Sequence, residues 1–372
     1  MTKLKRRNFI KKATSAAGLL ATTGLTAACT QNTSEKSTPH LQTSSKTYKW
    51  RCVTIWPPNF PVLGTAVNEM AKELEKLSGG RLQIQVFGAG ELVPAMEVFD
   101  AVQLGAVQMG HCAAYYWSGK MPSSVFFTSI PFGMLADQMN AWLLHGGGWD
   151  LWRELYEPLG LVPFPCGNTG VQMGGWFNKK IDTVDDLRGL KMRIPALGGK
   201  VFAKAGGAAV QLAGGEIYTS LERGVIDATE WIGPYHDYLM GFHKIAQYYY
   251  YPGWHEPGSV LELICNKKAL EELPAELQEM VKSTALKYNT LIHAEFEAKN
   301  NEYLKKIKAE SDAKVLPFPE EVLAHLKQYA EEELSLLVDS DPFAQKVYDN
   351  FRTFKQEINA WEEISSNVMR KW

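Results

Sequence analysis

The spacing of hydrophobic side chains changes repeatedly between two residues and three to four residues from residue 47 onward. A two-residue spacing, as in RLQIQVF (81–87), is typical of a strand with one buried face. A three- to four-residue spacing, as in VLGTAVNEMAKELEKL (62–77), is typical of an amphipathic helix. The first predicted strands are 48–56, 81–87 and 106–113, with helices at 62–77 and 95–105. This order predicts a parallel, doubly wound α/β sheet.

The same alternation returns in the middle of the chain and predicts a second α/β unit. Its predicted strands are 190–196, 208–212 and 225–231, and its predicted helices are 198–207 and 215–224. The extended runs 245–254 and 259–270 could return the chain to the first unit, before a helix over 269–311 and a strand over 313–319. We therefore expect a bilobed α/β fold with crossing strands, a helical C-terminal tail and a ligand cleft between the lobes.

The expected boundaries place lobe I over residues 47–165 and 263–318, lobe II over 166–262 and the C-terminal helices over 319–372. Residues 1–29 have a basic start, a short apolar middle and small residues before Cys29, which predicts an export signal. Arg6-Arg7 makes this segment similar to a twin-arginine signal. LTAAC resembles a lipoprotein cleavage box with its Leu one place too far from Cys29, so lipidation of Cys29 and simple cleavage both stay open. Residues 30–46 are rich in Ser and Thr and predict a flexible tether.

Composition excludes some classes of partner. Residues 1–28 hold six basic side chains and no acidic one, so their removal leaves 33 of the 39 Lys and Arg against 41 Asp and Glu, a net charge of −8. Because no basic cluster remains, we expect no nucleic-acid binding, and an anionic ligand would need a local positive group. Four further cysteines form no CxxC pair, and we expect free buried thiols, although export would permit disulfides: Cys52, Cys112, Cys166 and Cys265.

Motifs for catalysis are missing from the sequence. We find no G-x-S-x-G, H-E-x-x-H, G-x-G-x-x-G or P-loop motif. HGGGW (145–149) resembles an esterase oxyanion loop, but without a nucleophile elbow we interpret it as a turn and helix start. WHEPG (254–258) is not a zinc-protease motif, and the histidines do not pair at metal-binding spacing. An enzyme is therefore the less favoured hypothesis.

Polar side chains stand at or near the ends of the predicted strands of the second unit. Arg193 alternates with apolar residues, which indicates an internal salt bridge, an exposed position on an edge strand, or a fork that grips a carboxylate. Gln172 lies among glycines in GNTGVQMGGW, and Glu230 precedes Trp231 at the end of VIDATEW. These three positions are the candidate site.

The segment TVDDLRGLKMRIPALGGKVFAKAGGAAVQLAGGEIYTSLERGVIDATEW (183–231) resembles the core of the solute-binding subunits of TRAP transporters, the tripartite ATP-independent periplasmic carriers. The likeness extends over residues 47–372 and includes NKKALEELP (266–274) before the long helix. It implies a periplasmic binding protein without catalysis, with a long helix across both lobes, which delivers its ligand to membrane subunits. It also implies that Arg193 pairs with an organic carboxylate.

QMGGWFNKK (172–180) and TEWIGPYHD (229–237) resemble the branch that binds monocarboxylic 2-oxoacids or lactate with a metal ion, although Ala196 departs from its pattern. This likeness implies that Gln172, Glu230 and the Trp231 carbonyl hold sodium or calcium, hard ions that bind oxygen. Further candidates for contact with the acid are the aromatic residues Trp231, Trp176, Tyr115, Tyr116 and Trp117, and also Asn168, for which a turn role is equally open. A C4-dicarboxylate stays an alternative ligand. The amphipathic C-terminal helix could pack on its own core or on a second copy in a homodimer.

Overall fold

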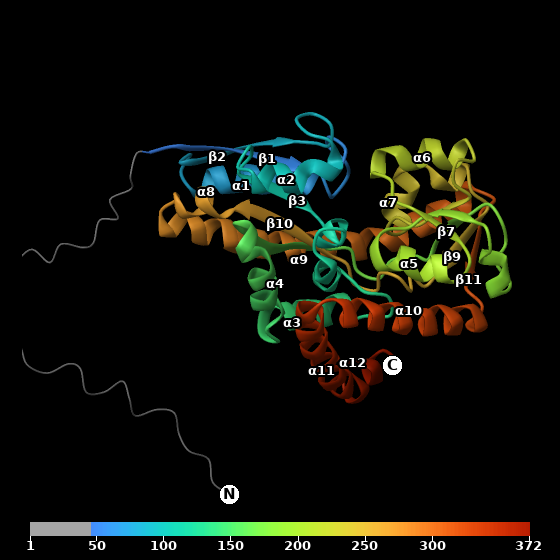
Figure 1. Cartoon of the computed structure of the whole chain (residues 1–372). Helices are drawn as coiled ribbons and strands as arrows, with labels where there is room; N and C mark the ends of the chain where they lie inside the picture. Colours follow the sequence, from blue (N-terminus) through green and yellow to red (C-terminus); the bar gives the residue numbers. More distant parts are fainter. Residues whose placement is uncertain (1–45) are drawn as a thin grey trace, which may run out of the picture. The chain divides into compact units, whose positions relative to one another are not determined.

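Two mixed β-sheets with helices on their faces organise residues 46–372, the part of the chain that the computed structural model describes (Figure 1). The export signal with Cys29 and nearly all of the tether expected over residues 30–46 lie outside the described residues. The two sheets confirm the expected α/β fold with two lobes.

The first sheet has five strands in the order β2-β1-β3-β10-β4. Its strands are β1 (Tyr48–Thr54), β2 (Leu82–Phe87), β3 (Met109–Cys112), β4 (Leu161–Asn168) and β10 (Val260–Asn266). β1 is parallel to β2 and β3, as expected, but β10 is antiparallel to both β3 and β4. The expectation of a parallel sheet is therefore wrong for this part, because β10 returns from the second sheet and enters from the opposite end.

Helices α1 (Thr65–Leu77) and α2 (Val98–Gln103) connect the first three strands. Helices α3 (Ala136–His145) and α4 (Gly148–Tyr156) precede β4, and the HGGGW stretch forms the turn between them and the start of α4, as expected. Phe127 stacks between Trp142 of α3 and Trp152 of α4, with ring centroids 5.8 and 5.4 Å away. These aromatic rings form much of the core on this side of the sheet.

The second sheet has six strands in the order β11-β9-β5-β8-β6-β7. Its strands are β5 (Gly175–Phe177), β6 (Lys191–Arg193), β7 (Ala208–Val210), β8 (Ala228–Thr229), β9 (Tyr248–Tyr251) and β11 (Lys314–Pro317), and its helices are α5 (Ala196–Lys204), α6 (Gly214–Glu222) and α7 (Pro234–Leu239). β11 pairs with β9, so residues 314–317 belong to this sheet and not to lobe I, where the boundary at 318 placed them. Conversely, Val260–Glu262 at the start of β10 belong to the first sheet.

The 36-residue helix α9 (Ala275–Glu310) explains why β11 joins the second sheet, because α9 precedes β11 and packs against α1 and β4 on the first sheet and against α7 on the second (Figure 1). It confirms the expected long helix across both lobes. The Asn289 side-chain oxygen on α9 accepts a hydrogen bond from the Gly167 N–H at 3.0 Å, near the point where the chain leaves the first sheet. Helix α8 (Lys267–Glu271) joins β10 to α9 and begins at Asn266, whose side chain caps it.

The C-terminal helices are α10 (Glu320–Ser340), α11 (Pro342–Ile364) and α12 (Ser366–Met369). Asp341 and Pro342 separate the first two, as expected, and the Asp341 carboxylate accepts a hydrogen bond from the Phe343 N–H at 2.9 Å. α10 packs against α5, and α11 packs against α10, α3 and α4. Among the described residues, none of the helices combines the length and the hydropathy that crossing a membrane requires.

The interior of the first sheet contains polar groups that pair with one another. The cysteines Cys52, Cys112, Cys166 and Cys265 are free and buried, which confirms the interpretation as thiols. Glu262 on β10 is fully buried and accepts hydrogen bonds from Trp117 Nε1 at 2.7 Å and Tyr156 Oη at 2.9 Å. Burial raises the pKa of Glu262 to about 7. Glu262 thereby anchors the short helix η2 (Ala114–Trp117), which leads toward the space between the sheets.

Candidate functional site

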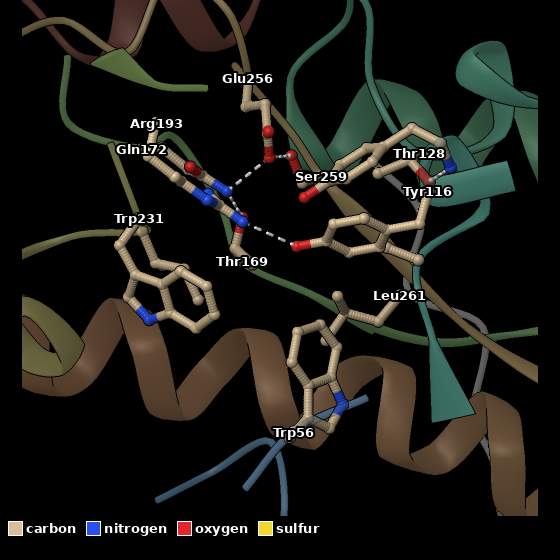
Figure 2. Close-up of a pocket in the computed structure, with 13 residues that line it drawn as sticks. Trp56, Tyr116, Thr128, Thr169, Gln172, Arg193, Trp231, Glu256, Ser259 and Leu261 are labelled. Carbon is tan, nitrogen blue, oxygen red and sulfur yellow. Dashed lines mark hydrogen bonds between the residues drawn. The ribbon is translucent and has the colours of Figure 1, made fainter. Parts of the chain in front are cut away.

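A pocket lies where the two sheets meet (Figure 2). Both sheets contribute to its wall, together with the two crossing segments that link them, residues 169–174 and 252–259. The chain near the first sheet supplies Trp56, Ala113, Tyr115, Tyr116, Thr128 and Leu261, the second sheet supplies Arg193, Trp231 and Ile232, and the crossing segments supply Thr169, Gln172, Glu256 and Ser259. Five of the predicted site residues, those at positions 115, 116, 172, 193 and 231, therefore line one pocket.

The second sheet brings Arg193 and Glu230 together for a simple geometric reason. Arg193 is the last residue of β6, and Glu230 directly follows the last residue of β8. The two strands are parallel neighbours, and Arg193 lies opposite Thr229. Because parallel strands end at the same edge of a sheet, side chains that follow both strands meet there. The sequence spacing of 37 residues between the two gives no direct indication of this contact.

Arg193 is almost completely buried and uses all of its nitrogens. Nη1 forms an ion pair with the Glu230 carboxylate, Nη2 donates to Tyr116 Oη at 3.0 Å, and Nε donates to the Leu212 carbonyl at 3.3 Å. Burial opposes the charge of Arg193, but the Glu230 carboxylate, Tyr116 and Tyr115 together outweigh the effect of burial, and the pKa of Arg193 lies above its usual range. The structure thus shows the internal salt bridge of Arg193 and places it in the pocket wall, while the grip on a ligand carboxylate stays a prediction.

Glu230, His255 and Glu256 form a buried cluster whose potential ligand atoms all lie within 4.8 Å of one another. Glu230 Oε2 lies 3.2 Å from His255 Nε2. Glu256 Oε2 accepts hydrogen bonds from Ser259 Oγ at 2.5 Å and from Gln172 Nε2 at 2.7 Å. Burial and the nearby Glu230 raise the pKa of Glu256 to about 7. Two acidic groups in such a small buried volume are a suitable environment for a cation.

Gln172 faces this cluster with one end of its side chain unused. Its Nε2 donates to Glu256 and to Thr169 Oγ1 at 3.1 Å, while its buried Oε1 has no hydrogen-bond partner among the described residues. A buried acceptor without a donor destabilises the fold by about 1–3 kcal/mol. A cation bound beside Glu256 would satisfy this oxygen.

Trp231 connects the second sheet to the chain that follows β1. Its ring lies over the Arg193 guanidinium, with 5.2 Å between the guanidinium carbon and the ring centroid, in a cation–π arrangement. Trp56 and Phe60 both meet the same ring edge-on, with centroids 6.4 and 6.0 Å away. Figure 2 shows Trp56 and Leu261 at the opposite end of the pocket from Arg193, Gln172 and Glu256. The pocket therefore has one charged end and one apolar end.

The structure separates the other aromatic candidates. Tyr115 and Tyr116 line the pocket with ring centroids 4.6 Å apart, whereas Trp117 points into the core toward Glu262. Trp176 is buried beneath the second sheet, where it stacks on Tyr249 at 4.0 Å and donates from Nε1 to Asp237 at 3.0 Å. The expectation that Trp117 and Trp176 line the cleft is therefore wrong, because buried carboxylates hold both indole rings elsewhere.

Asn168 is buried at the end of β4 but is absent from the pocket wall. Its side-chain oxygen accepts a hydrogen bond from the Gly170 N–H at 2.9 Å, which is the turn role that the sequence left open. Sequence reasoning missed Glu256, His255 and Ser259. Their signal was the polar stretch WHEPGS, whose His and Glu lie between an aromatic residue and a Pro-Gly turn.

Comparison with known proteins defines the class. Residues 52–339 match the family described as bacterial extracellular solute-binding protein, family 7. The chain therefore belongs to this family, and it is a solute-binding receptor of the TRAP type rather than an enzyme. It is 40% identical, over 97% of each chain, to a monocarboxylate 2-oxoacid-binding periplasmic protein of Nostoc sp..

Solved structures agree with this placement. A TRAP periplasmic solute-binding protein of Colwellia psychrerythraea with bound calcium and pyruvate has a TM-score of 0.85 and 40% identity, over 88% of this chain and 99% of that chain. One of Pseudoalteromonas atlantica with bound sodium and pyruvate has a TM-score of 0.85 and 41% identity over the same shares. A mixed-occupancy dimer of Bordetella bronchiseptica, with calcium and picolinate in one site, has a TM-score of 0.86 and 37% identity, over 88% of this chain and 97% of that chain.

Proposed function

We propose that the pocket between the sheets binds a small 2-oxo or 2-hydroxy monocarboxylate, such as pyruvate or lactate, together with one sodium or calcium ion for uptake by a TRAP carrier. The observation that carries this proposal is the buried Gln172 Oε1, which has no hydrogen-bond donor within residues 46–372 and lies in the side chain that contacts Glu256. The relatives from Colwellia and Pseudoalteromonas, with pyruvate beside calcium and sodium, support the same pair of ligands.

The charges of the pocket explain why acid and cation would bind together. Arg193 offers a cationic fork to a carboxylate, but Glu230 and Glu256 stand close to it and would repel the same group. A hard cation held by Glu230, Glu256, Gln172 and the Trp231 carbonyl would reverse this repulsion. The 2-oxo or 2-hydroxy oxygen would give such an ion a second ligand atom beside the carboxylate.

The pocket wall also favours a short monocarboxylate over a dicarboxylate. Arg193 is the one Lys or Arg side chain that lines the pocket in the described part of the chain, and the far end offers Trp56 and Leu261. A second carboxylate would lie against this apolar end without a cationic partner, which is unfavourable. A methyl or short alkyl group would bury apolar surface there instead.

Calorimetry on chelator-treated protein tests this proposal. We expect pyruvate to bind with a micromolar Kd, about −8 kcal/mol, when calcium or sodium is present, and to bind far more weakly in potassium buffer without either ion. Glu256→Gln should weaken the cation affinity at least tenfold, while the exposed Glu75→Gln should match the wild type. Undiminished pyruvate binding without both cations, or tighter binding of malate than of pyruvate, would refute the proposal.

We further propose that the protein acts at the outer face of the cytoplasmic membrane, after twin-arginine export and with Cys29 lipidated. The basis is the sequence pattern around Arg6, Arg7 and Cys29, together with membership of an extracytoplasmic family. Two sets of substitutions, studied in cells, test export and lipidation separately. Arg6→Lys with Arg7→Lys should retain the protein in the cytoplasm, and Cys29→Ser should abolish palmitate labelling and release the exported protein from membranes. Labelling that persists in the Cys29 variant would exclude this anchor.

The C-terminal helices support a homodimer as the assembled form. Four large apolar side chains on α11, on α12 and after it are more than half exposed: Trp361, Ile364, Met369 and Trp372. The relative from Bordetella bronchiseptica is a dimer. We infer that a second copy covers this surface. Light scattering should give twice the chain mass, and Trp361→Asp with Met369→Asp should give a monomer; a wild-type monomer at micromolar concentration would contradict the inference.

A further inference from the structure

A second cavity of about 170 Å³ lies between α10, α11 and the loop of residues 130–132, and it shares no lining residue with the pocket between the sheets. Its floor consists of four buried apolar side chains: Ile130, Ala330, Leu334 and Phe351. An apolar cavity of about 150 Å³ is large enough to hold benzene. The cavity therefore has room for one aromatic ring or for a branched chain of similar size.

Positive side chains surround the mouth of this cavity. Lys327 on α10 and Arg352 and Lys355 on α11 line it together with one acidic residue, Glu331. Among residues 46–372, neither Lys327 nor Lys355 forms an ion pair, and Arg352 has one exposed partner, Asp349, at 3.4 Å. Because the mature chain is acidic overall, this positive group is a local feature and not part of a basic surface.

Lys355 is the most constrained of these cations. It is half-buried, and burial together with the nearby Lys327 lowers its pKa. Its Nζ donates one hydrogen bond to the Phe132 carbonyl at 2.5 Å, which leaves two donors for another acceptor. A partly desolvated ammonium beside a second lysine is a free-energy cost that the nearby Glu331 carboxylate offsets only in part, and a bound anion would relieve it further.

The wall opposite the helices is fixed in place by its own contacts. Phe132 has a φ of 54°, and its N–H donates to the Trp254 carbonyl at 2.8 Å. Its ring stacks on Trp254 with centroids 6.0 Å apart. Lys355 holds the carbonyl of the same residue. The backbone of Phe132 is thus held from both sides, and the cavity does not depend on a ligand to form.

We propose that this cavity is a second binding site, for a small organic monoanion with a compact apolar body, such as an aromatic or branched-chain carboxylate. The carboxylate would contact Lys327, Arg352 and Lys355, and the apolar part would cover Leu334 and Phe351. Inorganic phosphate meets the charges but leaves the apolar floor in contact with water. A neutral ring fills the floor but leaves the cations unpaired.

Benzoate is a suitable probe, because its ring matches the volume and its carboxylate matches the charge. The protein is first saturated with pyruvate and calcium, so that an aromatic acid cannot enter the pocket between the sheets. Calorimetry should then give one further equivalent of benzoate with a Kd of about 1 mM, or −4 kcal/mol. Benzyl alcohol and phosphate, which each lack one of the two features, should bind at least tenfold more weakly.

Variants at the mouth and on the floor of the cavity test the location. Lys327→Met with Lys355→Met should weaken benzoate at least tenfold, and Leu334→Trp should abolish its binding by filling the cavity. The exposed Lys305→Met on α9 should behave as the wild type. All of these variants should bind pyruvate normally, so that failure here is distinct from failure of the proposed function.

Three outcomes would overturn this second site. Benzoate could bind the Lys327/Lys355 variant as tightly as the wild type, it could compete with pyruvate, or phosphate could bind as well as benzoate. The first outcome would show that Lys327 and Lys355 do not bind the carboxylate. The second would place benzoate in the pocket between the sheets. The third would show that the apolar floor does not contribute to binding. If Lys327→Met with Lys355→Met lowers the melting temperature, Lys327→Met alone decides the first point, because Lys327 is exposed at the mouth.

Discussion

Replacement of Arg193 by methionine is expected to affect stability and ligand binding by two separable mechanisms. The side chains of Arg193 and Glu230 are each 1% exposed, so Arg193→Met leaves a buried carboxylate without its charge partner. The removal of one partner of a buried ion pair typically destabilises a protein by about 3–5 kcal/mol. Loss of the fork that grips the ligand should cost a further 2–5 kcal/mol of binding free energy, roughly a 30-fold or larger rise in Kd.

Chemical denaturation without ligand measures the first effect, and calorimetry with pyruvate and calcium measures the second. The double variant Arg193→Met with Glu230→Gln removes both charges, so its stability should return to within about 1 kcal/mol of the wild type. Its pyruvate binding should stay as weak as that of the single variant. Recovery of stability without recovery of binding would establish that the pair is structural and that the weak binding of Arg193→Met is not caused by its lower stability.

Two results would refute this reasoning. If Arg193→Met unfolds at the wild-type denaturant concentration, Glu230 does not carry an uncompensated charge in the folded state. If the double variant binds pyruvate with the wild-type Kd, the fork does not hold the carboxylate, and the assignment of the pocket fails with it.

Two further predictions concern the framework around the site. The pKa of Glu262 rises from 4.5 to about 7 on folding, so its protonation stabilises the folded state fully below about pH 4.5 and not at all above about pH 7, a change of about 3 kcal/mol. Glu262→Gln should make denaturation curves less dependent on pH by this share, with the buried Asp237 and Glu256 supplying the rest, while Glu75→Gln should keep the wild-type dependence; equal slopes in both variants would contradict the burial argument. Gly175 has a φ of 118°, and an added Cβ would lie 2.6 Å from the Thr229 carbonyl oxygen, so Gly175→Ala should destabilise the protein by about 2–4 kcal/mol and weaken ligand binding. Gly119→Ala is its control, because no atom of the described residues lies within 4 Å of the new Cβ, and a similar loss in both variants would show that the effect is not specific to β5.

The sequence by itself determined the elements and most of the polar groups of the site. Local periodicity identified most of the strands and helices, although not α3, β4, β5 or α7, because burial of one face imposes a spacing of two in strands and of three to four in helices. Arg193, Gln172 and Glu230 were candidate site residues because they are polar and lie at or near the ends of predicted strands, where packing alone does not call for them. The motif likeness then gave the family and predicted that these residues act together.

The tertiary structure decided which strand joins which sheet and which side chains share the pocket. β11 joins the second sheet because α9 carries the chain there from the first sheet, where β10 ends, and no local pattern contains that distance. Trp117 and Trp176 do not line the pocket, because their indole nitrogens donate hydrogen bonds to the buried carboxylates of Glu262 and Asp237.

Glu256 is 84 residues from Gln172 and meets it because two crossing segments lie side by side between the sheets. Local patterns along the chain reveal which faces are buried. They do not reveal which distant carboxylate faces which amide, because that pairing depends on how the whole chain folds back on itself.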